Sequence, residues 1–274
     1  MGESFLRAQT RKFLGYAVNH LTRELDASAM RRPTVVFAPH QDDETLGCGG
    51  TIIKKKRLGG DVSIVFLTDG SRSHDLIPAQ ELKSIRVKEA LAASQLLGVA
   101  EGDVTFLEFE DGKLGEHLAS ATDRVKKVLR ERRFEQIFIP YSKDDDPSLD
   151  HLATNRIVVS ALKALKSNAE IYEYPIWFWR HWPWTNMSTR RPRRAWRVLH
   201  RGFTSGASLL KDFRCSVYIG DVLELKRDAL DQHKSQMTRL IPDARWGTLG
   251  DVSNGEFLEC FFQQREVFHR HILD

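Results

Sequence analysis

The chain has 274 residues, of which 41% are hydrophobic and 28% are charged. This length and composition are typical of a soluble protein of one or two domains, and they exclude collagen-like, disordered and multi-span membrane proteins. A globule of this size buries about three quarters of its unfolded surface and needs no cross-links. We expect residues 1–274 to form a single domain.

Three cysteines, Cys48, Cys215 and Cys260, lie far apart in the chain. Their spacing excludes a disulfide scaffold and a four-cysteine zinc site. The longest apolar run near the N-terminus, over 13–18, is too short for a signal peptide, and a membrane span needs about 20 apolar residues. These features favour a cytoplasmic location, with association with a membrane surface as the alternative.

The net charge of +4 is concentrated in one part of the chain. Residues 176–211 contain eight basic residues, no acidic residue and five of the six tryptophans. An anionic or lipid-linked sugar and a membrane surface both fit this basic insertion, because arginine binds phosphate and tryptophan is common at membrane interfaces. A packed aromatic loop with a solvated basic face fits it as well. No nucleic-acid motif accompanies the arginines, so no nucleic-acid partner is expected.

The first predicted element is an amphipathic helix over about 4–29, where Leu14, Val18 and Leu21 recur at helical spacing. Packing against the domain and contact with a membrane surface both fit this helix.

From residue 34 onward, short apolar strands alternate with helical patterns. Strands are expected over 34–38, 62–68, 104–109, 136–140 and 169–174, and helices over 47–58, 79–97, 118–132 and 151–166. After the basic insertion we expect a strand over 214–219 and helices over 222–238 and 256–269. The repeated order of strand and helix predicts an α/β protein with a three-layer, Rossmann-like fold, in which helices cover both faces of a mainly parallel sheet.

Polar residues follow the first of these strands, at the sheet edge where ligands bind in such folds. They read His40-Gln41-Asp42-Asp43-Glu44 and are followed by the glycine turn Gly47-Cys48-Gly49-Gly50. Histidine and carboxylate suit Zn²⁺, and a carboxylate that does not bind the ion can take a proton from its water. A helix cap and a surface histidine explain the same residues, and the pattern alone does not decide between the two interpretations.

A second polar segment, Ser148-Leu149-Asp150-His151, follows the fourth strand. His151 would complete a set of three metal ligands with His40 and Asp43, and Asp150 would orient a neighbouring ligand. The alternative is that Asp150 caps a helix and that residues 144–146 form a solvated turn. Matched ligand types at two separate strand ends favour the metal site.

These motifs resemble those of the PIG-L/LmbE-like zinc-dependent N-acetyl amino-sugar deacetylases. The first signature of that family, His-Pro-Asp-Asp-Glu before a glycine-rich turn, is matched by residues 40–44, with Gln41 in place of proline. The second, His-Pro-Asp-His, is matched by residues 148–151, with Ser148 in place of the first histidine. Weaker matches extend the similarity over most of residues 33–268.

The resemblance implies that His40, Asp43 and His151 bind Zn²⁺, although another divalent metal would fit the same ligands. Asp42 would be the general base, taking a proton from the attacking water and delivering one to the leaving amine. Zinc would polarise the acetamide carbonyl and stabilise the oxyanion. The products would be acetate and a free amino sugar.

The serine at position 148 departs from the family pattern, because a hydroxyl cannot supply the charge of the histidine that it replaces. His233, in a family-like segment, is the expected catalytic substitute, and His74 is a weaker candidate for the mouth of the site. Arg86 and Asp111 are expected to bind substrate, Arg86 through a phosphate or carboxylate and Asp111 through sugar hydroxyls. A surface histidine, an ion pair and a turn explain His233, Arg86 and Asp111 as well.

The predicted function is zinc-dependent hydrolysis of an N-acetyl group on an amino-sugar substrate. One alternative is a binding or regulatory protein that keeps the metal but turns over weakly, which Ser148 would explain. The other is a nucleotide-dependent α/β transferase, which the absence of a G-x-G-x-x-G turn disfavours. The sequence leaves the oligomeric state open.

Overall fold

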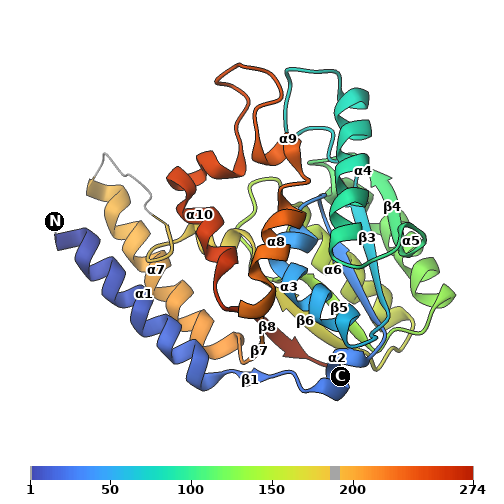
Figure 1. Ribbon diagram of the computed structural model, residues 1–274, viewed down its shortest axis with the longest axis horizontal. Helices are drawn as coiled ribbons and strands as arrows, with labels where there is room; N and C mark the ends of the chain where they lie inside the picture. Colours follow the sequence, from blue (N-terminus) through green and yellow to red (C-terminus); the bar gives the residue numbers. More distant parts are fainter. Residues whose placement is uncertain (1, 186–191, 274) are drawn as a thin grey trace.

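The computed structural model describes residues 2–185 and 192–273, and these residues build one eight-stranded sheet (Figure 1). The strands are β1 (Arg23–Glu24), β2 (Thr34–Ala38), β3 (Val62–Thr68), β4 (Val104–Phe109), β5 (Gln136–Pro140), β6 (Glu170–Tyr174), β7 (Cys215–Tyr218) and β8 (Arg265–His271). Their order across the sheet is β1-β7-β8-β6-β5-β2-β3-β4. Every neighbouring pair from β6 to β4 is parallel, and β8 runs antiparallel to β6 and β7.

Ten α-helices surround this sheet in the described part of the chain. They are α1 (Gly2–Leu21), α2 (Ala27–Arg31), α3 (Asp43–Arg57), α4 (Ala79–Leu96), α5 (Leu118–Glu131), α6 (Asp150–Ala164), α7 (Pro192–Asp212), α8 (Leu223–Leu230), α9 (Lys234–Met237) and α10 (Glu256–Glu259). Short 3₁₀ turns, η1 (Glu101–Asp103), η2 (Leu114–His117), η3 (Trp177–Arg180), η4 (Gly220–Val222), η5 (Leu249–Gly255) and η6 (Cys260–Phe262), join several of them.

Alternate residues of the central strands enter two different cores. Val36 of β2 and Phe66 of β3 pack with α3, α4 and α8 on one face of the sheet. Val35 and Phe37 of β2 pack with α5 and α6 on the other face. Because successive side chains of a strand point to opposite faces, a strand that is apolar at every position is buried on both sides. The predicted three-layer α/β fold is confirmed.

The N-terminal segment differs from the single helix expected over 4–29. Helix α1 ends at Leu21, and Arg23–Glu24 form β1, which pairs in parallel with β7. Helix α2 then starts afresh, because the Asp26 side chain accepts a hydrogen bond from the backbone N–H of Ala29. Pairing with β7, a segment about 190 residues away, interrupts a pattern that is helical on local grounds.

The helix expected over 256–269 is wrong in its second half. Helix α10 and the turn η6 end by Phe262, and Arg265–His271 form the strand β8 between β6 and β7. The helix expected over 222–238 is two helices, α8 and α9, separated by residues 231–233. Extended pairing on both sides of β8 decides its conformation, and no local residue pattern reveals this pairing.

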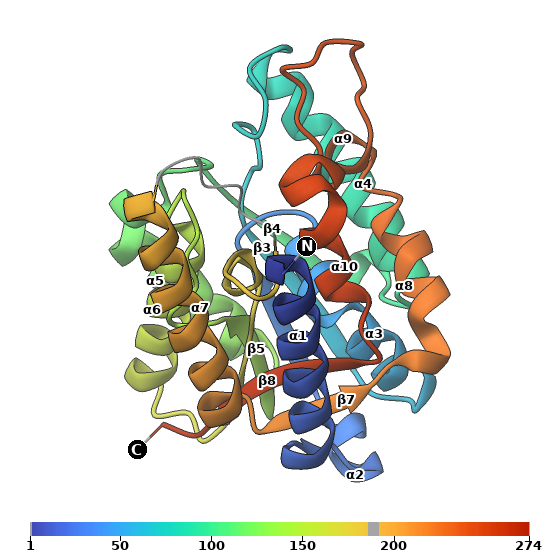
Figure 2. The same ribbon diagram turned by 90° about the vertical axis from the view of Figure 1, so that its left-hand side faces the viewer.

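The basic insertion expected over 176–211 contains the turn η3 and the helix α7, which lies beside α1 at the edge of the molecule (Figure 2). Leu14 of α1 and Leu209 of α7 share a third core with Phe178 and Trp184. Arg190 and Arg191 lie outside the described residues, as do the side chains of 192–199 and 201.

A buried ion pair joins the glycine turn of α3 to β8. The Glu266 carboxylate accepts hydrogen bonds from the backbone N–H groups of Gly50 and Thr51. Lys226 is fully buried and donates to Glu266 at 2.8 Å and to the backbone oxygens of Leu46 and Phe261. This pair fixes the start of α3 against the antiparallel edge of the sheet.

Replacing Glu266 with alanine should lower the free energy of unfolding by about 3–5 kcal/mol, because the buried ammonium of Lys226 loses its counter-charge. Urea denaturation followed by circular dichroism measures this loss. The double variant Lys226→Met with Glu266→Leu removes both charges and should recover part of it. A loss below about 1 kcal/mol in Glu266→Ala would contradict a stabilising role for the pair.

Candidate active site and metal centre

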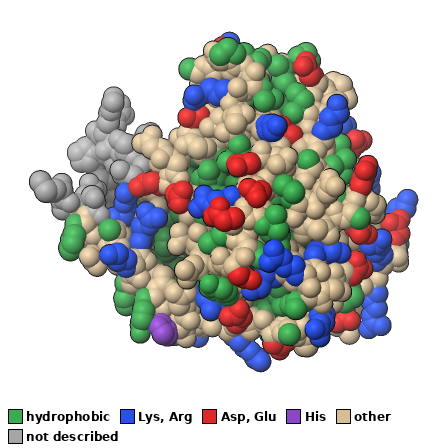
Figure 3. Space-filling model, viewed as in Figure 1, with side chains coloured by type: hydrophobic (Ala, Val, Ile, Leu, Met, Phe, Trp, Pro, Cys, Tyr) green, Lys and Arg blue, Asp and Glu red, His purple; other side chains and the backbone are tan. Residues whose placement is uncertain are grey.

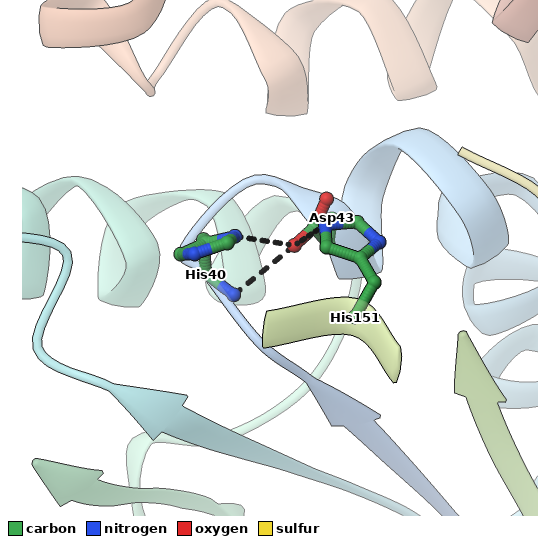
Figure 4. Close-up of side chains that lie close together, drawn as sticks. All are labelled: His40, Asp43 and His151. Atoms are coloured by element: carbon green, nitrogen blue, oxygen red, sulfur yellow. Dashed lines mark hydrogen bonds and ion pairs between the residues drawn. The ribbon is translucent and has the colours of Figure 1, made fainter. Parts of the chain in front are cut away.

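Three predicted ligand side chains converge at the carboxyl edge of the sheet (Figure 4). His40 follows β2, Asp43 is the first residue of α3, and His151 lies in the first turn of α6. His40 Nδ1 is 3.2 Å and His151 Nε2 is 3.4 Å from the same oxygen, Oδ2 of Asp43. The two motifs meet because β2 and β5, the strands that precede them, are direct neighbours.

Three consecutive acids point in different directions because the backbone at Asp42 is unusual. Asp42 has φ 146° and ψ −28°, a conformation that residues with a Cβ rarely adopt. The buried carboxylate of Glu44 accepts a hydrogen bond from the backbone N–H of Asp42 at 3.0 Å and holds it there. Asp43 then turns towards the two histidines, and Asp42 turns towards Arg86. Strain of this kind is concentrated at functional sites.

Each histidine is oriented by carboxylates on its other ring nitrogen. His40 Nε2 lies 3.2 Å from Asp111 Oδ1 and 3.3 Å from Asp150 Oδ2. His151 Nδ1 lies 2.9 Å from Asp144 Oδ2. Metal-binding histidines commonly have such a carboxylate partner, which selects the tautomer and the ring orientation. Asp150 therefore lies where an orienting residue was expected, and Asp111 contacts His40 as well as the cavity.

The electrostatics of the cluster favour a positive charge. Burial acts to lower the pKa of His40, but hydrogen bonds to Asp111 and Asp150 raise it well above its usual value. Burial also opposes protonation of His151, yet the Asp43 carboxylate raises its pKa to about 10. Burial acts to raise the pKa of Asp43, but His151 and His40 more than offset it and hold that pKa below its usual range. Buried carboxylates thus outweigh the cost of placing cations here.

The donor set fits a divalent metal ion. One ligand atom from each of His40, Asp43 and His151 lies within 4.8 Å of the other two. Two imidazole nitrogens and one carboxylate oxygen are ligands that Zn²⁺ prefers, and three protein ligands leave a coordination position for water or substrate. In a second group of three, His40, Asp111 and Asp150, one ligand atom of each residue also lies within 4.8 Å of the other two. It uses the opposite nitrogen of the His40 ring, which fits an orienting role.

Asp42, the predicted general base, lies beside the cluster with its side chain almost completely buried. Burial raises the pKa of its carboxyl to about 6, although Arg86 acts to lower it. Arg86 Nη2 is 3.4 Å from Asp42 Oδ2 and donates to the backbone oxygen of Gln41 at 2.6 Å. Nη1 donates to the backbone oxygen of Gly70. Much of the guanidinium is therefore committed to the loop that carries the base.

A cavity of about 510 Å³ opens over these groups. Its walls come from both motifs and from distant parts of the chain, including Arg72, His74, Arg86, Ser148, Trp177 and Phe257. Trp177, from the basic insertion, stacks on Phe257 with ring centroids 5.0 Å apart. The cavity thus combines an aromatic wall with a charged floor, which is the usual composition of a site for a small polar ligand.

Ser148, which replaces the family histidine, lines the cavity, whereas His233, its expected substitute, does not. Ser148 lines the cavity, and its hydroxyl donates to Asp146 at 2.5 Å. His233 is fully buried outside the cavity lining, and its Nε2 lies 3.3 Å from Glu44 Oε1. His74 does line the cavity; its Nε2 contacts the backbone oxygen of Ser235 at 3.1 Å.

Two residues of this site were not recognised from the sequence. Asp144, expected in a solvated turn, is buried, contacts His151 and accepts hydrogen bonds from the backbone N–H groups of Trp177 and Phe178. Glu44, for which a helix cap was one of two open interpretations, holds the backbone of Asp42. In both segments the available signal was a run of three acids that begins four residues after a buried strand, but only the tertiary contacts separate the roles of these acids.

Comparison with known proteins finds a family similar to part of this chain. Residues 35–162 match the family described as GlcNAc-PI de-N-acetylase, PIG-L, and this segment contains both motifs. Residues 35–162 are therefore similar to a PIG-L family domain, and the resemblance drawn from the motifs is confirmed.

Individual relatives are deacetylases. The chain is 32% identical to diacetylchitobiose deacetylase of Thermococcus kodakarensis over 111 residues, which are 40% of each protein. It is 26% identical to 1D-myo-inositol 2-acetamido-2-deoxy-alpha-D-glucopyranoside deacetylase of Segniliparus rotundus over 250 residues, covering 76% of this chain and 77% of that protein. The match thus spans less than half of the first relative and about three quarters of the second.

The fold is shared with a solved structure. N,N'-diacetylchitobiose deacetylase from Pyrococcus horikoshii, complexed with its inhibitor MPG, has a TM-score of 0.61 and 22% sequence identity. The superposition covers 88% of this chain and 84% of that chain. This similarity supports the α/β fold described above.

Because the backbone of Asp42 has a positive φ, glycine at position 42 should be more stabilising than alanine, which is the opposite of its effect within a helix. Asp42→Gly should be more stable than Asp42→Ala by about 1 kcal/mol or more in the free energy of unfolding, because glycine adopts positive φ without a Cβ penalty. Chemical denaturation of both variants measures the difference.

The matched control is Asp123, which lies within α5. There Asp123→Gly should be less stable than Asp123→Ala by about 1 kcal/mol, the ordinary helix penalty for glycine. The same order of stability at both positions would show that the backbone at Asp42 is not strained.

Proposed function

We propose that this chain is a metal-dependent N-deacetylase that hydrolyses the acetamide group of an amino-sugar substrate, with Zn²⁺ as the preferred metal. The observation that carries the proposal is the convergence of His40, Asp43 and His151 within 4.8 Å, next to the separate buried carboxylate of Asp42. A metal-binding protein without hydrolytic activity needs the three ligands but has no use for the fourth group. The names of the two curated relatives support the same reaction.

A divalent cation held by these ligands would polarise the amide carbonyl and make a water molecule more acidic. Asp42 takes a proton from the attacking water, and burial prepares it for this role by raising its pKa towards neutrality. As the carbon–nitrogen bond breaks, the same carboxyl returns the proton to the leaving nitrogen. Water and the amide are converted to acetate and a free amine.

The neighbouring residues hold Asp42 in position for this transfer. Arg86 contacts its carboxylate, and Glu44 fixes its backbone. We assign His233 to the same group, because its imidazole lies against Glu44 and reaches Asp42 through that carboxylate. In this assignment His233 is a positioning residue. The positive charge that the family histidine would provide must then come from another group in the cavity.

An amino sugar fits the walls of the cavity. Trp177 offers an aromatic surface on which the apolar face of a sugar ring can stack, and Asp111 offers a carboxylate oxygen for sugar hydroxyl groups. Arg72 and Arg86 line the cavity as well, and their guanidinium groups favour a substrate with an anionic substituent such as a phosphate. A lipid-linked sugar is one member of that class.

Purified protein supplied with Zn²⁺ should release acetate from N-acetyl amino sugars, tested as chitobiose, inositol-linked and phosphate-linked forms. Asp42→Asn should reduce kcat at least about 100-fold and keep the bound metal, because it removes a general base and no ligand. His151→Ala should lose the metal, measured by elemental analysis of the dialysed protein. Asp123→Asn, an exposed carboxylate on α5, is the matched control and should keep full activity.

The outcomes separate the proposed enzyme from its alternatives. Bound metal without acetate release from any of these substrates would favour a binding or regulatory protein. Acetate release that is unaffected in Asp42→Asn would overturn the assignment of the base.

Ser148→His should raise kcat at least about tenfold on the best substrate, because a cationic donor in the cavity stabilises the developing oxyanion or the leaving amine. Ser148 is half-buried at the cavity wall, so a larger side chain can extend into the open space. Ser148→Gln has a similar size without the charge and serves as the control. An equal rate in wild type and Ser148→His would mean that another group already supplies this charge.

A further inference from the structure

The helix pair at the edge of the molecule exposes a line of large apolar side chains. On α1, Phe5, Leu6, Phe13 and Tyr16 are 68%, 59%, 63% and 65% exposed, and Phe203 of α7 is 76% exposed. The exposed phenylalanines of the described residues all lie on these two helices. Figure 3 shows hydrophobic side chains along the lower left edge of the molecule, where Figure 1 places α1. Clustered exposure of this kind marks an interaction surface.

The exposed side chains share one side of α1. At 100° per residue, Phe5, Phe13 and Tyr16 lie within about 80° of one another around the helix axis. Leu14, on the opposite side, is 5% exposed and packs into the core shared with α7. The helix thus buries one apolar face and presents a second apolar face outward, which packing on the protein body does not explain.

Helix α1 packs against α7. A Cβ atom built at Gly206 of α7 would lie 3.7 Å from Leu14 Cδ1, so the two helices approach closely. The Arg7 guanidinium donates to both carboxylate oxygens of Glu256 and ties α1 to α10. We define the docking ridge as the outward faces of α1 and α7 with Phe5, Phe13, Tyr16 and Phe203.

The charge of the docking ridge selects its partner. Lys12 and His20 of α1 and Lys211 of α7 are exposed on these helices. The one acid of α7, Asp212, is directed inward to Tyr141 and Lys143. Among the described side chains, the outward faces therefore combine aromatic, aliphatic and cationic groups, and the one acid of α1, Glu3, lies outside the described side chains.

We propose that the docking ridge binds the surface of an anionic lipid bilayer. Aromatic and aliphatic side chains would enter the boundary between headgroups and acyl chains, and the cations would lie at the level of the lipid phosphates. A second copy of this chain fits less well, because a symmetric contact would place Lys12 and its neighbours against cations of the same kind. In the described part of the chain no helix is long and apolar enough to cross a bilayer.

The full chain should sediment with vesicles of phosphatidylcholine and phosphatidylglycerol, and far less with vesicles of phosphatidylcholine alone. The double variant Phe13→Ser with Tyr16→Ser should lower the partition coefficient about tenfold, because two apolar contacts with the interface are lost. High salt should weaken binding of the wild type, since the cations act through the charge of the lipid surface.

The matched control is Leu96→Ser with Leu118→Ser, two exposed apolar residues outside the docking ridge, which should bind as the wild type does. Equal binding of the two double variants, or no preference for anionic vesicles, would overturn the proposal. It would also be overturned if ultracentrifugation found a wild-type dimer that Phe13→Ser with Tyr16→Ser dissociates. Acetate release from a soluble substrate should be unchanged in both double variants, so this test is independent of the proposed enzymatic function.

Discussion

The burial of several carboxylates around two histidines is the constraint on which the rest of the site depends. Each unpaired charge in such a place would cost several kcal/mol, so the cluster is stable only with a compensating positive charge. The pKa values of His40 and His151 are raised and that of Asp43 is lowered for this reason. A divalent cation satisfies the same requirement with a fixed geometry. The chemistry and the local stability of the protein therefore share one electrostatic origin.

The sheet brings the parts of this cluster together. Neighbouring parallel strands end at the same edge, so β2 and β5 deliver segments that are about 110 residues apart in the chain. Within the first segment, the strained backbone of Asp42 separates adjacent carboxylates into different roles. This strain is held by Glu44, whose own neighbour is His233. We propose that Glu44 and His233 position Asp42, in place of the direct catalytic contact expected of His233.

The docking ridge and the proposed active site use different parts of the fold. The site lies on the parallel half of the sheet, whereas α1 and α7 pack with the turn η3 and with Val267 of β8. The basic insertion serves both regions, because Trp177 lines the cavity and α7 supports the ridge. Under the two proposals, a change at the ridge would therefore alter where the protein acts without altering how the reaction proceeds.

The sequence by itself determined the parallel α/β core and the histidine–carboxylate motifs that follow its strands. Continuous apolar runs of strand length and histidine–carboxylate motifs are local patterns, and they survive in the structure because nothing distant opposes them. It did not determine β8, β1 or the break between α8 and α9, since these depend on pairing and packing between remote segments. The roles of Asp144 and Glu44 were hidden for the same reason. The direction of a buried carboxylate is decided by the partners that desolvate it, and only the tertiary structure places those partners beside it.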